Sequence, residues 1–167
     1  MSVLNQLELV TEAQKSTPVN LTALARHLDV NIRHQAFDDN ISGCIHKTED
    51  GWEIVVNAKH PKTRQRFTLA HELGHFIYHR NRLGQGTNDT RAYRADPNAA
   101  FYNSDIERKH EVEANKFAAG LLMPIDQVVH AVRTTRLNDP AVLAPLFGVS
   151  PAAMQIRIEA LGKRGLL

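Results

Sequence analysis

The fold of this chain is decided by residues 64–79, which read RQRFTLAHELGHFIYH. This stretch contains the pattern His-Glu-x-x-His, formed by His71, Glu72 and His75, inside an apolar, helix-forming run. Two histidines four residues apart lie on one face of a helix, so both rings can reach one metal ion. A glutamate beside the first histidine can reach a water bound to that metal. The pattern therefore predicts a helix that carries a metal site.

The stretch divides into a polar arc and an apolar remainder when it is placed on a helix. At about 100° per residue, the arc runs from His71 at 0° through His75 at about 40°, Thr68 at about 60° and His79 at about 80° to Glu72 at about 100°. Apolar residues and one glycine fill most of the remaining circle: Phe67, Leu69, Ala70, Leu73, Gly74, Phe76 and Ile77. A buried helix with one polar strip is expected beneath a cleft. The alternative, a chance pattern on an ordinary helix, requires no such strip.

The composition limits the class of protein. A length of 167 residues and an apolar fraction of 43% suit one globular domain with a sizeable core. The net charge of +2 favours neither a nucleic-acid nor a membrane partner. The single cysteine excludes an internal disulfide and fits a reducing compartment. We find neither a signal peptide nor an apolar run of membrane-spanning length, so we expect a cytoplasmic protein.

Turn and cap residues divide the segment before the metal helix. We predict helices over residues 3–14 and 20–28 and strands over residues 31–37, 41–47 and 52–56. Asn20 is a candidate N-cap, Asp50-Gly51 is a strong hairpin signal, and Pro61 is expected in the first turn of the metal helix. Cys44 falls in the first hairpin strand. We interpret it as a small buried apolar residue rather than a thiolate that blocks the metal.

The third metal ligand is predicted on a helix further along the chain. A catalytic zinc site needs three protein ligands and an open position for water. The capping box Ser104-Asp105-Ile106-Glu107 predicts a helix over residues 105–123. On this helix Glu111 shares an apolar arc with Ala114 and Ala118, while Glu113 lies about 200° away and is expected to face solvent.

A carboxylate on a buried helix face needs a partner, and zinc supplies one. We therefore predict Glu111 as the third ligand beside His71 and His75. Asn115 lies about 40° from Glu111 on the wheel and is predicted to orient a ligand histidine from outside the coordination sphere. The small side chains of Ala114 and Ala118 are expected to let the two helices approach closely. An amphipathic helix with stray acids is the alternative.

Two motifs in this order resemble the ImmA/IrrE family of zinc metallopeptidases: RFTLAHELGH at residues 66–75 and EVEANKFAAGLLMP at residues 111–124. The resemblance covers residues 18–162. It implies a small gluzincin-like fold, with zinc on His71, His75 and Glu111 and Glu72 as the catalytic residue. It also implies an intracellular bacterial or mobile-element protein that cuts a cognate helix-turn-helix repressor. Asn115 departs from the aspartate that related gluzincins often carry, which would lower the basicity of the ligand histidine.

Residues 80–103 show no periodicity and are longer than the resemblance leads us to expect. Such a stretch is either a solvated loop or a lid over the cleft. As a lid it would bring Arg91, Tyr93, Arg94 or Tyr102 near the substrate. Tyr93, Tyr102 and His110 are candidates to stabilise the oxyanion, although no signal distinguishes among them.

Residues 140–154 predict helix, glycine turn, serine cap and second helix, in the manner of a helix-turn-helix unit. From residue 124 onward the chain carries five basic and three acidic side chains, which is a weak footprint for DNA. Gln155 and Arg157 are the main candidates to read bases. We therefore expect this tail to dock a protein or to serve a structural role, with DNA binding as the lesser alternative.

The sequence thus predicts an α+β zincin. A metallopeptidase core over residues 1–123, with a short three-stranded sheet over the metal helix, is followed by a helical tail over residues 124–167. The predicted activity is zinc-dependent endopeptidase cleavage of a helix-turn-helix repressor, with Glu72 as general base and an edge strand holding the substrate. The alternative is a non-enzymatic regulator that binds DNA or a partner and whose metal is structural. A structural zinc would need four protein ligands, and the sequence offers no fourth near the motif.

Overall fold

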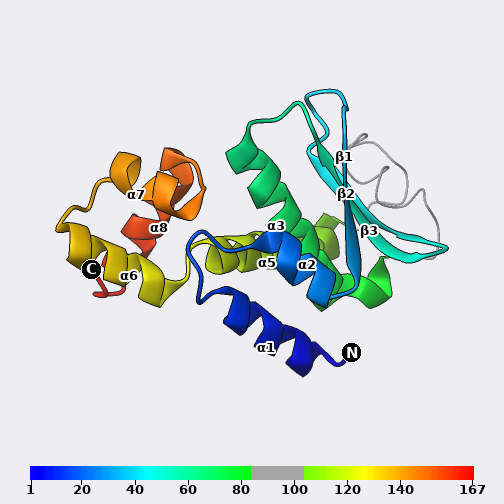
Figure 1. Ribbon diagram of the computed structural model, residues 1–167, viewed down its shortest axis with the longest axis horizontal. Coiled ribbons are helices and arrows are strands. Elements are labelled where there is room, and N and C mark those ends of the chain that lie inside the picture. Colours follow the sequence, from blue (N-terminus) through cyan, green and yellow to red (C-terminus); the bar gives the residue numbers. More distant parts are fainter. Residues whose placement is uncertain (84–103) are drawn as a thin grey trace.

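The computed structural model describes the backbone of residues 1–83 and 104–167 and the side chains of residues 1–81, 83 and 108–167. The chain folds as an α+β protein in which a small sheet and its helices form one end and a group of helices forms the other (Figure 1). The first helices are α1 (Val3–Ala13) and α2 (Leu21–His27). The side chain of Asn20 accepts a hydrogen bond from the backbone N–H of Ala23, so the predicted N-cap of α2 is confirmed.

The sheet contains β1 (Val30–Gln35), β2 (Gly43–Thr48) and β3 (Gly51–Asn57) in the order β1-β3-β2. β2 and β3 pair antiparallel, which confirms the hairpin predicted around residues 48–51. β1 pairs parallel with β3, from Val30 opposite Trp52 to Gln35 opposite Asn57. The central strand is therefore β3, and β1 and β2 are the edges of the described sheet.

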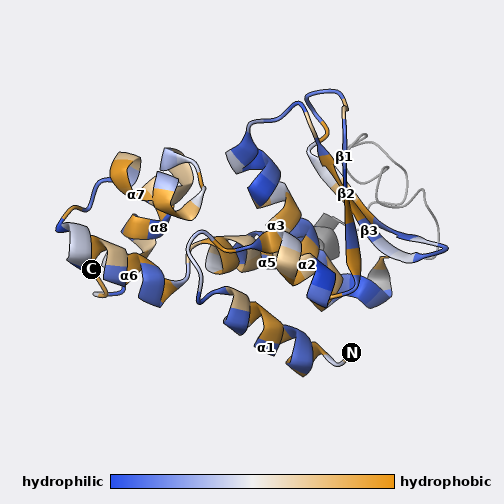
Figure 2. Cartoon of the chain, viewed as in Figure 1, coloured by the Kyte–Doolittle hydropathy of each residue, from blue (hydrophilic) through white to orange (hydrophobic). Residues whose placement is uncertain are grey.

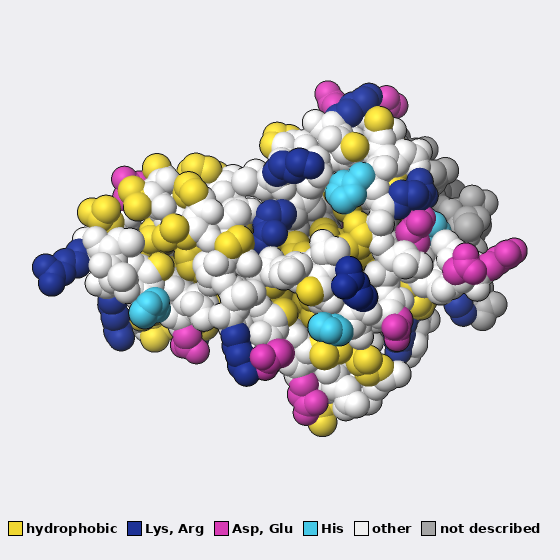
Figure 3. Space-filling model, in the orientation of Figure 1, with side chains coloured by type: hydrophobic (Ala, Val, Ile, Leu, Met, Phe, Trp, Pro, Cys, Tyr) yellow, Lys and Arg dark blue, Asp and Glu magenta, His cyan; other side chains and the backbone are white. Residues whose placement is uncertain are grey.

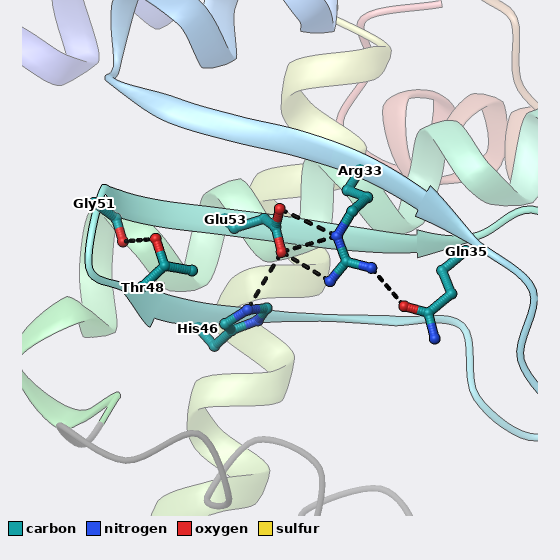
Figure 4. A network of polar contacts seen from close by, with 6 residues as sticks. All are labelled: Arg33, Gln35, His46, Thr48, Gly51 and Glu53. Carbon is teal, nitrogen blue, oxygen red and sulfur yellow. Dashed lines mark hydrogen bonds and ion pairs between the residues drawn. The ribbon is translucent and has the colours of Figure 1, made fainter.

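A polar network crosses one face of this sheet (Figure 4). Arg33 on β1 donates to both carboxylate oxygens of Glu53 on β3, with Nη2 2.9 Å from Oε2. His46 on β2 brings its Nε2 to 3.3 Å from the same Oε2. The hydrogen bonds from Arg33 lower the pKa of Glu53, against the opposing effect of its partial burial. The network ties all three strands together on this face.

The metal helix predicted from the sequence is α3 (Lys62–His79), followed by a short 3₁₀ turn, η1 (Arg80–Arg82). Pro61 occupies the N-cap position rather than the first helical turn, so that prediction is wrong by one residue. Most of α3 from residue 68 to residue 77 is buried, because α3 packs against the sheet and α5 (Ser104–Leu122). Figure 2 shows its polar first turns away from the apolar centre of the molecule. The side chains of the predicted capping box lie outside the described residues.

Close helix packing brings α5 onto α3. A Cβ added to Gly74 would lie 2.9 Å from Cδ1 of Phe117 and 3.2 Å from the Cα of Ala114. Ala114 and Ala118 are fully buried, which confirms that small residues let the helices approach. Cys44 is also buried, at 8% exposure, in agreement with the interpretation of a buried small residue. Small residues, Gly74 on α3 and Ala114 and Ala118 on α5, therefore occupy the interface between the two helices.

The tail contains α6 (Ile125–Thr135), α7 (Pro140–Phe147) and α8 (Pro151–Gly162). Gly148 ends α7 in the left-handed conformation, and Ser150 caps α8 by accepting from the N–H of Ala153. α7 and α8 turn by 106° across this three-residue connection, which matches a helix-turn-helix unit. Among the described helices none is by itself long and apolar enough to cross a membrane, and α7 with α8 meets that test only as this bent pair.

Candidate metal centre

The candidate centre lies where α3 faces α5. His71, His75 and His79 follow each other at intervals of four residues along α3, and all three are buried, at 4%, 8% and 5% exposure. Because four residues make slightly more than one turn, the three rings form a row along one side of the helix. α5 runs in the opposite direction, so its residues near position 110 meet the end of α3 and Asn115 meets its middle.

Three donor atoms from the two helices converge on one point. Nε2 of His71 and Nε2 of His75 lie 3.0 Å apart. The carboxylate of Glu111 completes the group, with Oε2 3.2 Å from Nε2 of His71 and Oε1 3.0 Å from Nε2 of His75. All three donors fall within 4.8 Å of one another. The structure therefore brings together the three residues that the sequence predicts as metal ligands.

The chemistry of this donor set fits a zinc ion. Ligand atoms held about 2.0–2.1 Å from a tetrahedral zinc lie roughly 3.3 Å from one another, close to the spacing found here. The Nδ1 of His71 lies 2.9 Å from Oδ1 of Asn115, an oxygen that can only accept, so His71 carries its proton on Nδ1. With Nδ1 engaged in this hydrogen bond, Nε2 is the nitrogen that faces the other donors and would offer its lone pair when a metal binds. Two imidazoles and one carboxylate are a common ligand set for catalytic zinc.

The surroundings of Glu111 also favour the ionised form of its carboxylate, which is the form that binds a cation. Burial alone would raise the pKa of Glu111, but the hydrogen bonds and charges of His71 and His75 outweigh it and hold the pKa far below its usual range. The carboxylate is therefore ionised at neutral pH. Its side chain remains 41% exposed, whereas the side chains of His71 and His75 are 5% and 10% exposed.

Glu111 and Glu113 differ from the sequence prediction in their exposure to solvent. The helical wheel places Glu111 toward the core and Glu113 toward solvent, yet both side chains are 41% exposed. Glu113 accepts a hydrogen bond from His79, with Oε2 2.9 Å from Nε2. A wheel gives the direction in which Cβ leaves the helix, whereas a glutamate can reach sideways along a neighbouring helix. Both acids thus meet histidines of α3.

The catalytic candidate Glu72 follows His71 directly on α3 and is 2% exposed. Tyr93 and Tyr102, two candidates for stabilising the oxyanion, lie outside the described residues, as do Arg91 and Arg94 of the suggested lid. The ring of the third candidate, His110, lies against the ring of His79, with centroids 4.3 Å apart and planes tilted by 40°.

One residue of the site received no role from the sequence. His79 brings its Nδ1 to 3.1 Å from Nδ1 of His75, while its Nε2 meets Glu113. Burial lowers the pKa of His79 and outweighs the hydrogen bond to Glu113, which raises it, so the ring is neutral at neutral pH. The signal was present in the sequence, since His79 continues the four-residue interval of His71 and His75 and lies on the same polar arc.

Comparison with known proteins gives two findings. Residues 25–159 match the sequence model of a peptidase family described as the IrrE N-terminal-like domain. A curated protein of Bacillus phage phi105, described as an uncharacterized immunity region protein 2, is 28% identical over 137 residues. That alignment covers 81% of this chain and 77% of the phage protein. The family match includes both the metal helix and the helix that carries Glu111.

Proposed function

Because this chain belongs to the IrrE N-terminal-like domain family of peptidases, we propose that it is a zinc-dependent endopeptidase that cleaves an intracellular protein. The observation that carries the proposal is the convergence of His71, His75 and Glu111 within 4.8 Å. Three ligands leave one position of a tetrahedral zinc for water and substrate. Among the described residues this group has no fourth protein ligand, which argues against the alternative, a regulator with a structural metal, because a structural zinc is closed by four protein ligands.

We propose separate catalytic roles for the zinc ion, Glu72 and Asn115. Zinc, when bound, would polarise the scissile carbonyl and lower the pKa of a bound water. Glu72 would accept the proton of that water and return it to the leaving amine. Its burial keeps bulk water from competing for the proton and strengthens its interaction with nearby charges. Asn115 would hold His71 in the tautomer whose Nε2 faces the metal.

An edge strand of the sheet offers a place for an extended substrate. The space between β2 and α3 is tight at Gly43, where an added Cβ would lie 2.7 Å from Cγ2 of Thr68. Thr68 precedes His71 by less than one turn, so the beginning of β2 lies beside the metal helix. β2 pairs with β3 on one side and forms an edge of the described sheet. A peptide that adds to β2 as a further strand would lie close to the metal.

We propose a helix-turn-helix repressor as the substrate. The phage relative carries the description of an immunity region protein, which suits a role beside a repressor. DNA binding by the tail is disfavoured, because the two residues that the sequence offers for reading bases already donate hydrogen bonds within the protein. Arg157 donates from Nε to the backbone oxygen of Met123, and Gln155 donates to Glu159.

The tail surface instead suits a protein partner. Figure 3 shows apolar side chains at the surface of the tail end of the molecule. The large apolar side chains exposed there include Leu137, Val142, Leu146 and Ile156. Val142 and Leu146 lie four residues apart on α7 and therefore share one face. We propose that residues 124–167 help to deliver the repressor to the metal centre, and that the core comprises residues 1–123.

Incubation with a repressor tests this function directly. The probes are helix-turn-helix repressors from the genome that encodes this chain, each added to the zinc-loaded protein with and without a chelator. We expect one discrete cleavage that the chelator abolishes and that added zinc restores. Cleavage that persists in the chelator, with zinc removal confirmed by metal analysis, would contradict a zinc-dependent mechanism.

A further inference from the structure

The residues behind the metal centre form a continuous line of contacts. His79 lies between His75 and Glu113, with Nδ1–Nδ1 and Nε2–Oε2 distances of 3.1 Å and 2.9 Å. We propose that His79 and Glu113 are positioning residues, which fix the tautomer and ring orientation of His75 so that its Nε2 lone pair faces the metal. The inference rests on the proposed metal site. It assigns a role to two residues that the sequence left without one.

The protons in this line can be placed by elimination. A neutral imidazole has one N–H and one lone pair. If Nε2 of His75 binds a metal, the proton of His75 is on Nδ1 and is donated to Nδ1 of His79. His79 must then carry its own proton on Nε2, which faces Glu113. An ionised carboxylate only accepts hydrogen bonds, so every donor in the line meets an acceptor.

The two ligand histidines are thus supported from different helices in different ways. His71 donates from Nδ1 to Asn115 on α5, and His75 donates from Nδ1 to His79 on its own helix. A histidine that binds a metal usually donates its other N–H in this manner, and loss of such a partner typically weakens metal affinity 10- to 100-fold. Because His79 is 5% exposed, water is a poor substitute for its Nδ1.

A second metal site is the rival explanation for this cluster. His79, His110 and Glu113 also place donor atoms within 4.8 Å of one another, and they line a surface hollow of about 700 Å³. A metal there would take the lone pair of His79 Nε2 and would move the proton to Nδ1. That proton would then meet the N–H of His75, so the first site could not stay occupied with His75 neutral. The tautomers therefore favour a positioning role over a second site.

Zinc affinity of two matched variants tests the inference. Asparagine and leucine have nearly the same shape, but the Oδ1 of asparagine lies close to the position of His79 Nδ1 and accepts a hydrogen bond. We expect His79→Leu to weaken zinc binding about 10- to 100-fold in a chelator competition, and His79→Asn to retain affinity within a few-fold. Leucine is the better helix former and the better buried residue, so a merely structural role would rank the two variants in the opposite order.

Two further measurements separate the explanations. In the zinc-loaded protein, ¹⁵N NMR should find the proton of His75 on Nδ1 and that of His79 on Nε2. His110→Leu should leave one zinc per chain and an unchanged affinity. Two zinc ions per chain, with one lost in His110→Leu, would overturn the inference in favour of the second site. Equal zinc affinities in His79→Leu and the unaltered protein would also overturn it.

These readouts are independent of proteolysis. If the unaltered protein binds zinc, His79→Leu weakens that binding and His79→Asn retains it, the inference stands even where no protein substrate is cut. If a repressor is cut but His79→Leu binds zinc as tightly as before, the inference fails and the proposed function stands. Melting curves of the metal-free variants confirm that each is folded before its affinity is compared.

Discussion

Substitution of Gly74 by alanine probes the contact that sets the distance between the two helices of the metal centre. The added methyl group would lie 2.9 Å from Cδ1 of Phe117 and 3.2 Å from the Cα of Ala114. Carbon atoms in favourable contact are about 3.5–4.0 Å apart, so α5 or the Phe117 ring must move by several tenths of an ångström. Because Ala114 contributes backbone at this contact, ring rotation alone does not relieve the overlap.

The expected magnitude follows from two opposing effects. Replacement of a glycine inside a helix by alanine gains about 1 kcal/mol of helix propensity. Insertion of a methyl group into a filled contact costs about 1–3 kcal/mol. Gly120→Ala isolates the first effect, because a Cβ at Gly120 on α5 meets nothing within 4 Å. We therefore expect Gly74→Ala to be less stable than Gly120→Ala by about 1–3 kcal/mol.

Thermal unfolding of the two metal-free variants measures this difference. For a domain of this size, 1 kcal/mol corresponds to a shift of about 2–4 °C in melting temperature. Gly120→Ala should melt above the unaltered protein and Gly74→Ala should melt below Gly120→Ala. Movement of α5 should also displace Glu111 from the histidines, so Gly74→Ala should bind zinc more weakly. A Gly74→Ala protein that melts as high as Gly120→Ala, with unchanged zinc affinity, would refute the reasoning.

Three further predictions concern the ligand support, the sheet and the tail. Asn115→Leu should weaken zinc binding about 10-fold or more by chelator competition, because His71 loses its acceptor, whereas Asn115→Asp should bind at least as tightly; equal affinities would contradict this role. Arg33 lowers the pKa of Glu53, so Glu53→Gln should lower the melting temperature at neutral pH. This difference in melting temperature should vanish as the pH falls from about 4 through the lowered pKa, because Glu53 then becomes protonated. A difference that persists in acid would contradict the pairing. Residues 124–167 should bind DNA weakly and without sequence preference, and a salt titration that finds nanomolar binding to one sequence at about 150 mM salt would favour the regulator alternative.

Local patterns predicted the elements of this protein well. The polar arc around His71 and the glycine, serine and proline signals at residues 148–151 depend on neighbours within one or two turns, and the structure contains the corresponding helices. The parallel pairing of β1 with β3 has no such local signal, because it joins strands about twenty residues apart through backbone hydrogen bonds. Long-range pairing of this kind is decided by packing of the whole core.

The same distinction applies to the metal centre. The pattern of His71, His75 and Glu111 required only spacing and ligand chemistry. The contact between Glu113 and His79 required the reach of a flexible side chain across the helix interface, which a wheel does not contain. It also required the antiparallel direction of α5 relative to α3 and their close approach at Gly74 and Ala114, neither of which a wheel contains.

The most direct test of the central claim compares zinc content and cleavage in Glu72→Gln. Glutamine keeps the size and most of the polarity of the side chain but cannot accept the proton of an attacking water. We expect near-normal zinc content, with cleavage of the repressor reduced by at least the roughly 10²–10⁴-fold typical of a lost general base. Glu111→Ala serves as the contrasting variant and should lose the metal together with the activity. Undiminished cleavage by a zinc-loaded Glu72→Gln protein would contradict the account.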